Sequence, residues 1–140
     1  MSDFRYGRLI EVKEKLLDYK KTELDSARTS LKAVVAEITD VDEDAVRTYA
    51  CLTEKCITGN ELSVLTGYLS YLDSRKNTLN LEKTQQEHRI AALQQELLNL
   101  EIERKMLEKL RFKTLQITKK ASNKKEQKIM DELALRVEGQ

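Results

Sequence analysis

The sequence predicts an all-α protein in which two long helices form an antiparallel coiled-coil hairpin, with the C-terminal helix longer and overhanging. One observation behind this prediction is composition, and the others are two heptad repeats and their common register. The 140-residue chain has no proline and four glycines, whereas average usage would give roughly seven and ten. Because β and α/β domains need many tight turns, which draw on both residues, these fold classes are excluded.

The first heptad repeat lies in the N-terminal part of the chain. Its apolar members lie seven residues apart at Ile10, Leu17, Leu24, Leu31 and Ile38, with Ala27, Val34 and Val41 as a companion row. Charged residues fill the positions between them, as a solvated face requires. A repeat sustained over four heptads favours a coiled coil over a single surface helix. We expect this helix to span about residues 4–57.

The second heptad repeat predicts a helix over residues 61–136. Its members are Leu65, Leu72, Leu79, Gln86, Leu93, Leu100 and Leu107, with Leu69, Ile90 and Leu97 as the companion row. Gln86 is the one polar member. Either its side chain points outwards and Ile90 fills that layer, or it stays in the seam and fixes the register at some cost in stability.

The two repeats share a register that predicts a hairpin. The residue numbers of Ile10 and Leu107 add up to 117, and so do those of Ile38 and Leu79. The mirror point of this pairing falls between residues 58 and 59, where a glycine stands. We therefore expect a single helical hairpin over residues 1–140, with its turn at 58–60.

The two interior glycines, Gly59 and Gly67, lie in the predicted turn and shortly after it. Gly59 is expected to take the left-handed conformation that ends the first helix. Asn60 is expected to cap the second helix, with Glu61 favourable in its first turn. Gly67 follows shortly afterwards and is expected to allow close packing near the turn.

The register leaves residues 115–140 without a first-helix partner. An apolar stripe runs along this overhang at Ile129, Met130, Leu133, Ala134 and Val137. Residues 104–128 carry ten basic and two acidic side chains, whereas residues 37–44 form an acidic cluster. A helical stripe without an internal partner suggests an external one, the alternative being a frayed tail. The opposite charges suggest different partners at the two ends.

No motif for catalysis, cofactor binding or metal binding occurs. His88 is the single histidine, and Cys51 and Cys56 are five residues apart, which is not a zinc spacing. One or both cysteines are expected to act as small apolar side chains in a reducing cytosol. There is no phosphate-binding loop, no run of apolar residues long enough to cross a membrane and no signal peptide. We expect a protein that is not an enzyme and uses no cofactor.

Three stretches of the chain resemble the flagellar FliJ protein family. They are the opening FRYGRLIEVKE at residues 4–14, residues 59–72 after the turn, and KEQKIMDELALR at residues 125–136. The last stretch is the most specific, because a coiled-coil repeat does not explain it. Together they cover nearly the whole chain, although the resemblance leaves the flagellar and the related virulence secretion systems as alternatives.

The resemblance implies a soluble, chaperone-like stalk component of the flagellar type III export apparatus. Such proteins insert their open end, formed by the two chain termini, into the hexameric export ATPase. Their tip, next to the turn, contacts the export gate, a membrane protein, and they also engage export chaperones. The implied location is the cytoplasm, with peripheral association with the inner membrane at the flagellar base and no direct membrane insertion. Nucleic acid is not expected as a partner.

The resemblance also suggests which residues bind these partners. At the tip, Tyr68 and Leu72 match family positions that face the gate, and Tyr49 is added from its place on the facing arm. Leu72 also belongs to the internal seam in the register above. At the open end, the expected ATPase contacts are Phe4, Leu9, Lys124, Lys125, Met130, Leu133 and Arg136.

Three other functions compete with this interpretation. A generic coiled-coil scaffold would dimerise, because a two-helix hairpin buries little surface by itself. A prefoldin-like holdase would add β-strands at the base of the hairpin, and no stretch reads as a strand. A nucleic-acid-binding protein would use residues 104–128, but these lack interleaved aromatic residues beyond Phe112.

Overall fold

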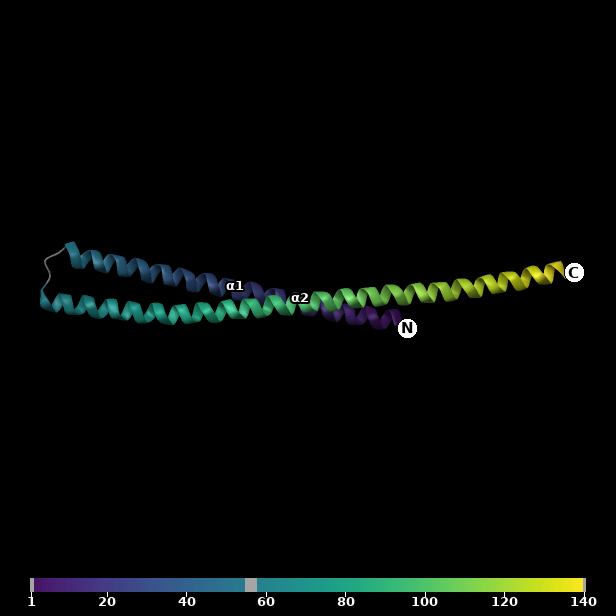
Figure 1. Cartoon of the computed structure of the whole chain (residues 1–140), viewed down its shortest axis with the longest axis horizontal. Coiled ribbons are helices and arrows are strands. Elements are labelled where there is room, and N and C mark those ends of the chain that lie inside the picture. The colour runs from purple at the N-terminus through teal and green to yellow at the C-terminus, as the bar shows by residue number, and fades with distance from the viewer. Residues whose placement is uncertain (1, 55–57, 140) are drawn as a thin grey trace. The chain divides into compact units, whose positions relative to one another are not determined.

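A computed structural model describes residues 2–54 and 58–139, and these residues form two helices. Helix α1 spans Ser2–Glu54 and helix α2 spans Gly59–Glu138 (Figure 1). The described part of the chain contains no strand. The predicted all-α fold with a longer second helix is confirmed.

The chain divides into two compact units, and each contains a segment of both helices. Unit 1 comprises Met1–Tyr19 with Leu97–Gln140, and unit 2 comprises Lys20–Glu96. In unit 2, Lys20 pairs with Glu96 and Glu37 pairs with Arg75. The difference between the two residue numbers of a pair therefore becomes smaller towards the turn. In unit 1, Lys13 pairs with Glu103, and Gly7 lies near Arg111. In each unit, pairs with higher residue numbers on α1 have lower residue numbers on α2, so the two helices are antiparallel.

The buried apolar residues in the described part are all members of the predicted heptad repeats. In unit 1 they include Ile10 and Leu17, and in unit 2 Leu79 is completely buried. The others are Leu24, Ala27, Leu72 and Leu93. The core is therefore the seam between the helices, and its apolar positions follow the predicted pattern.

The seam also holds long basic side chains, which the apolar pattern alone did not predict. Lys13, Lys20, Lys76, Lys83 and Arg104 are half-buried at the spacing of three and four residues that defines the seam. Their alkyl stems can cover apolar surface, and the charged groups of Lys13, Lys20, Lys76 and Arg104 reach carboxylates. The Lys20 ammonium lies 2.9 Å from Glu96, and that of Lys76 lies 2.7 Å from Asp42.

Gln86 stays in the seam. Its Oε1 atom is buried and accepts no hydrogen bond within residues 2–54 and 58–139. The interpretation in which this side chain points outwards is therefore wrong. Thr48, a buried polar residue, differs because its hydroxyl donates to the Asp44 carbonyl at 2.8 Å. Only Gln86 thus carries the energetic cost of an unsatisfied oxygen.

The start of α2 differs from the prediction. The Glu61 amide donates to Thr58 Oγ1 at 3.3 Å, and the Thr58 amide donates to Glu61 Oε2 at 3.4 Å. This reciprocal pair is a capping box, with Thr58 as the N-cap. Gly59 and Asn60 therefore lie inside the first turn of α2, and no described glycine has a positive φ. The predicted left-handed Gly59 and Asn60 cap are wrong.

Two further details of the predicted turn change. The first helix is described to Glu54, and residues 55–57, which the prediction assigned to its end, lie outside the described residues. The prediction for Gly67 is wrong, because a Cβ atom at this position would meet nothing within 4 Å. Gly67 is exposed, so close packing does not require its missing side chain.

Candidate partner-binding surfaces

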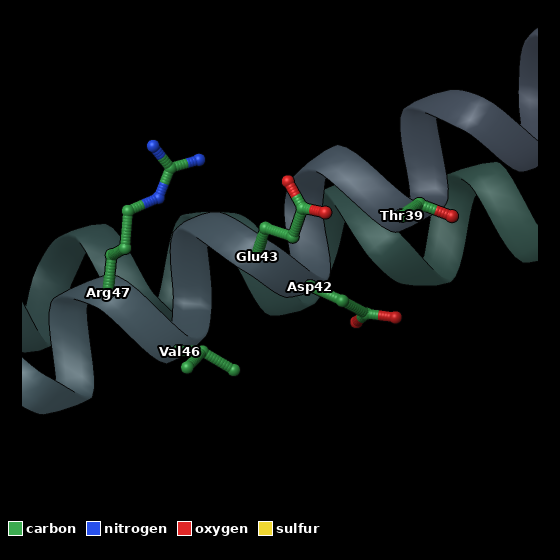
Figure 2. Close-up of a pocket in the computed structure, with 5 residues that line it drawn as sticks. All are labelled: Thr39, Asp42, Glu43, Val46 and Arg47. Carbon is green, nitrogen blue, oxygen red and sulfur yellow. The ribbon is translucent and has the colours of Figure 1, made fainter.

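The described surface offers shallow hollows on exposed helix rather than enclosed sites. One hollow is lined by Thr39, Asp42, Glu43, Val46 and Arg47, all from α1. Figure 2 shows these side chains spread along one helix, with Glu43 and Arg47 on one side of it and Asp42 and Val46 on another. Such a surface has no walls that could exclude water from a reaction. Any binding by this hollow would therefore use exposed helix surface.

The candidate chemical residues are equally exposed. No group of three or more histidine, cysteine or acidic residues in the described part could hold a metal ion. His88 is exposed, and so is Cys51, which therefore does not fill the predicted role of a small buried apolar side chain. Cys56 lies outside the described residues. No described helix combines the length and the apolarity needed to span a membrane.

At the tip, two tyrosines of α2 form one exposed cluster. The rings of Tyr68 and Tyr71 stack with their centroids 6.2 Å apart and an interplanar angle of 25°. The Tyr68 hydroxyl donates to Asp44 Oδ2 of α1 at 3.5 Å. Tyr71 was missed by the sequence prediction, although a residue three positions along a helix is a neighbour on its surface. Both rings are exposed and can be covered by a partner.

The other predicted tip residues do not join this cluster. Tyr49 is exposed, but it lies one heptad beyond Asp42, on the side of unit 2 where Asp42 pairs with Lys76. Tyr68 lies one heptad before Arg75, on the side where Arg75 pairs with Glu37. These are opposite sides of the seam.

Leu72 is the exception among the predicted binding residues. Its side chain is only 4% exposed because it occupies the seam between the helices. The register of the hairpin already uses this side chain, so a gate contact by Leu72 would require the seam to open.

The acidic cluster at residues 37–44 is largely balanced by bases. Glu37 pairs with Arg75 at 3.0 Å and Asp44 with Arg47 at 3.0 Å. The pKa of Lys76 is raised, mainly by its hydrogen bond to Asp42 and also by the charge of that carboxylate. The cluster therefore serves contacts within unit 2, and its net field on a partner is smaller than its sequence suggests.

At the open end, the predicted overhang of α2 is confirmed. Thr114 is the last half-buried residue, and every residue from 115 to 139 is exposed. Met130 is 67% exposed and Leu133 is 50% exposed, and both lie on the stripe with Ile129 and Val137. The three charged residues predicted to bind the ATPase are exposed as well: Lys124, Lys125 and Arg136.

The two predicted contacts on α1 lie apart from these overhang residues. Phe4 and Leu9 are 75% and 41% exposed. Phe4 lines a hollow with Gly7 and Arg111, which places it near residue 111 of α2. At 1.5 Å per residue, residues 124–136 lie roughly 20–37 Å further along that helix. The open end is therefore an extended surface rather than one compact site.

Two antiparallel helices with a seam core and exposed apolar and basic surfaces define a coiled-coil protein that acts through contacts along its helices. The family model for the flagellar FliJ protein matches residues 2–138, and the chain belongs to this family. It is therefore a component of flagellar protein export. Searches among curated proteins and among solved structures find no match to this chain.

Proposed function

We propose that this protein is the stalk of the export ATPase in the flagellar export apparatus. The overhang of α2 enters the hexameric ATPase and promotes its activity, while the tip contacts the cytoplasmic domain of the export gate. The protein acts in the cytoplasm, held at the inner membrane by these partners, and it also engages export chaperones. This proposal rests on the family membership together with the two exposed ends described above.

The single observation that carries the ATPase contact is the overhang. A helix that continues from residue 115 to Glu138 without burying any residue gains nothing from internal packing there. Its apolar stripe at Met130 and Leu133 would lose water only against another protein. Basic residues such as Lys124 and Lys125 add attraction to an acidic lining.

Deletion of residues 119–140 tests the ATPase contact. The truncated protein is expected to lose stimulation of the purified ATPase while circular dichroism still reports the paired helices, because the deleted residues contribute nothing to the seam. Undiminished stimulation would contradict the proposal.

Point variants locate the contact on one face of the overhang. Met130→Asp with Leu133→Asp should lower stimulation, whereas Leu135→Asp is the matched control, because Leu135 is 68% exposed and lies on another face. Equal losses from both faces would indicate general damage to the helix rather than one contact stripe.

The gate contact rests on the tyrosine cluster. Exposed aromatic side chains often dominate interfaces, at about 2 kcal/mol or more each, and Tyr68 and Tyr71 present two of them together. Tyr49 offers a second contact on the opposite side of unit 2. A gate domain that grips both sides of the tip would use all three rings.

Binding of the purified gate domain to alanine variants tests this contact. Tyr68→Ala is expected to weaken gate binding at least tenfold while ATPase stimulation persists, and Tyr49→Ala reports on the opposite side. Leu81→Ala is the matched control, since Leu81 is an exposed residue of the same helix outside the tip. Unchanged gate affinity of Tyr68→Ala would exclude the tyrosine cluster as the contact.

A further inference from the structure

Unit 1 carries an exposed apolar face that lies away from the tip and reaches the overhang only at Ile117. On α1, Leu9 and Leu16 are neighbours of Lys13 on the helix surface, and Lys13 pairs with Glu103. Val12 and Tyr19 lie three positions after each of these leucines and extend the row outwards. All four side chains are at least 40% exposed, so α1 presents a continuous apolar row on the Glu103 side of the seam.

Helix α2 continues this face. Leu110 and Ile117 lie one and two heptads beyond Glu103, and heptad-related residues share one side of a coiled coil. Met106 is three positions after Glu103 and lies on the outer part of the same side. These three residues are 45%, 68% and 59% exposed, respectively. Together with the α1 row they form what we call the unit 1 apolar face.

The charges around this face have one sign. Five basic residues border it or end its rows: Arg5, Arg8, Lys15, Lys109 and Lys113. The acidic residue within it is Glu103, which is already paired with Lys13. A face of this kind attracts a partner that combines apolar and acidic side chains.

The opposite side of unit 1 has the reverse character. Gly7 lies beside Arg111 there, and five acidic residues are spaced around these two: Glu11, Glu14, Asp18, Glu101 and Glu108. Basic residues mix with them, since Arg8 lines a hollow with Glu11, and Lys105, Lys109 and Lys113 line one with Glu108. Exposed apolar residues such as Leu98 and Phe112 are interspersed with these acids. Glu103 is thus the acidic residue of the apolar face, and because Lys13 already pairs with it, an acidic partner would meet little repulsion there.

We propose that the unit 1 apolar face docks an acidic amphipathic helix of another protein. An exposed apolar surface formed by two helices can accept the apolar stripe of a third helix. The basic border favours a docking helix that carries glutamate and aspartate beside its apolar stripe. A second copy fits poorly, since face-to-face packing would bring five basic residues against five. Packing of the basic side of one copy on the acidic side of another would be open-ended rather than closed.

Fluorescence anisotropy with stapled helical peptides tests the proposal on the full-length chain. One labelled peptide carries leucine in a heptad pattern with glutamate elsewhere, and the other replaces each glutamate by lysine. We expect the glutamate peptide to bind at least tenfold more tightly, which corresponds to about 1.4 kcal/mol. Equal binding of the two peptides would overturn the proposal.

Substitutions assign the binding to this face. Met106→Glu and Val12→Glu should each weaken binding of the glutamate peptide about tenfold, because both residues are exposed and outside the seam. Leu98→Glu is the matched control on the acidic side, with a similar exposure, and should change binding by less than about twofold. Loss of binding in Leu98→Glu alone would place the site on the wrong side and overturn the proposal.

Two further measurements separate this inference from its alternatives. Deletion of residues 119–140 should leave peptide binding intact, so the apolar face can fail or succeed independently of the proposed ATPase contact. Light scattering of the chain alone should report a monomer. A dimer that Met106→Glu dissociates would instead identify a second copy as the occupant and overturn the proposal.

Discussion

Units 1 and 2 share the same seam but differ in what flanks it. Both contain heptad layers of aliphatic residues mixed with long basic side chains, such as Lys13 in unit 1 and Lys76 in unit 2. In unit 2 both sides of the seam carry ion pairs between the helices, namely Glu37–Arg75 on one side and Asp42–Lys76 on the other. In unit 1 the side that carries the Lys13–Glu103 pair also carries a row of exposed aliphatic residues.

This difference separates the residues that hold the helices together from those that are free for other contacts. The seam alone provides the buried surface in both units, so flanking positions can vary without loss of the fold. Unit 2 uses them for charge pairs that set which carboxylate faces which base. Unit 1 leaves apolar surface uncovered, which costs solubility and is typical of interaction sites.

The largest expected effect tests whether the seam is equivalent in the two units. Leu17→Ala in unit 1 and Leu79→Ala in unit 2 remove side chains that are 4% and 0% exposed. Each should lower the free energy of unfolding by about 2–4 kcal/mol, measured by urea denaturation. Leu81→Ala, at an exposed position, should change it by less than about 0.5 kcal/mol. A negligible loss for Leu17→Ala would show that unit 1 is not part of the cooperative transition.

The second prediction concerns one unsatisfied polar atom in each unit. Gln86 Oε1 in unit 2 and Arg104 Nε in unit 1 are buried without a hydrogen-bond partner in the described part of the chain. Gln86→Leu and Arg104→Leu should each raise the free energy of unfolding by about 1 kcal/mol, because an unsatisfied group is replaced by apolar packing. Gln85→Leu, at an exposed neighbour, is the control. Destabilisation by Gln86→Leu would mean that this oxygen is satisfied in solution.

A smaller effect is expected from the flanking ion pairs. Arg75→Glu should destabilise the protein by about 0.5 kcal/mol, because the partners lie on the surface. The double variant Glu37→Arg with Arg75→Glu should recover that loss. The same double-mutant cycle on Lys13 and Glu103 gives the value for unit 1. A coupling energy of zero between Glu37 and Arg75 would show that the flanking ion pairs of unit 2 do not stabilise it, contrary to the comparison with unit 1.

The smallest effect is a pH dependence in unit 2. Asp42 raises the pKa of Lys76 above its usual value of 10.5. Folding therefore gains stability from this pair below the unfolded pKa, and the gain is lost as the pH rises through the folded pKa. The difference in unfolding free energy between the wild type and Lys76→Met should shrink as the pH rises from 10.5 through the raised pKa of folded Lys76. Asp42→Asn should show the same dependence of unfolding free energy on pH as Lys76→Met. If the wild-type curve runs parallel to the curves of these variants, the Asp42–Lys76 pair does not cause the pH dependence.

Much of the fold could be predicted because heptad spacing carries the information. Each buried aliphatic residue follows from apolar residues that recur every seven positions, and the register followed from pairing the two repeats. The basic seam residues could not be found in this way, because a lysine at a seam position looks like any surface lysine. Only the structure shows that these side chains are half-buried in the seam and that the ammonium groups of Lys13, Lys20 and Lys76 lie on carboxylates.

The candidate surfaces were less predictable. The exposed overhang followed from counting residues beyond the partner helix. The start of α2 did not, because glycine was given more weight than the capping sequence from Thr58 to Glu61. Leu72 was predicted both as a seam residue, from the heptad register, and as a gate contact, from the resemblance to the family. The structure places its side chain in the seam. Tyr71 was overlooked because it belongs to neither heptad repeat. The difference between the two sides of unit 1 can be recognised only when the register and the flanking charges are considered together.

The capping box at Thr58 also bears on the order of folding. Helix α1 is described to Glu54 and α2 begins at Gly59, so the seam pairs nearest the turn close the shortest loops and cost the least chain entropy. A capped first turn of α2 lowers the cost of helix nucleation at the same place. Folding should therefore start beside the turn and proceed as a zipper towards the termini, so that the apolar face of unit 1 is assembled last.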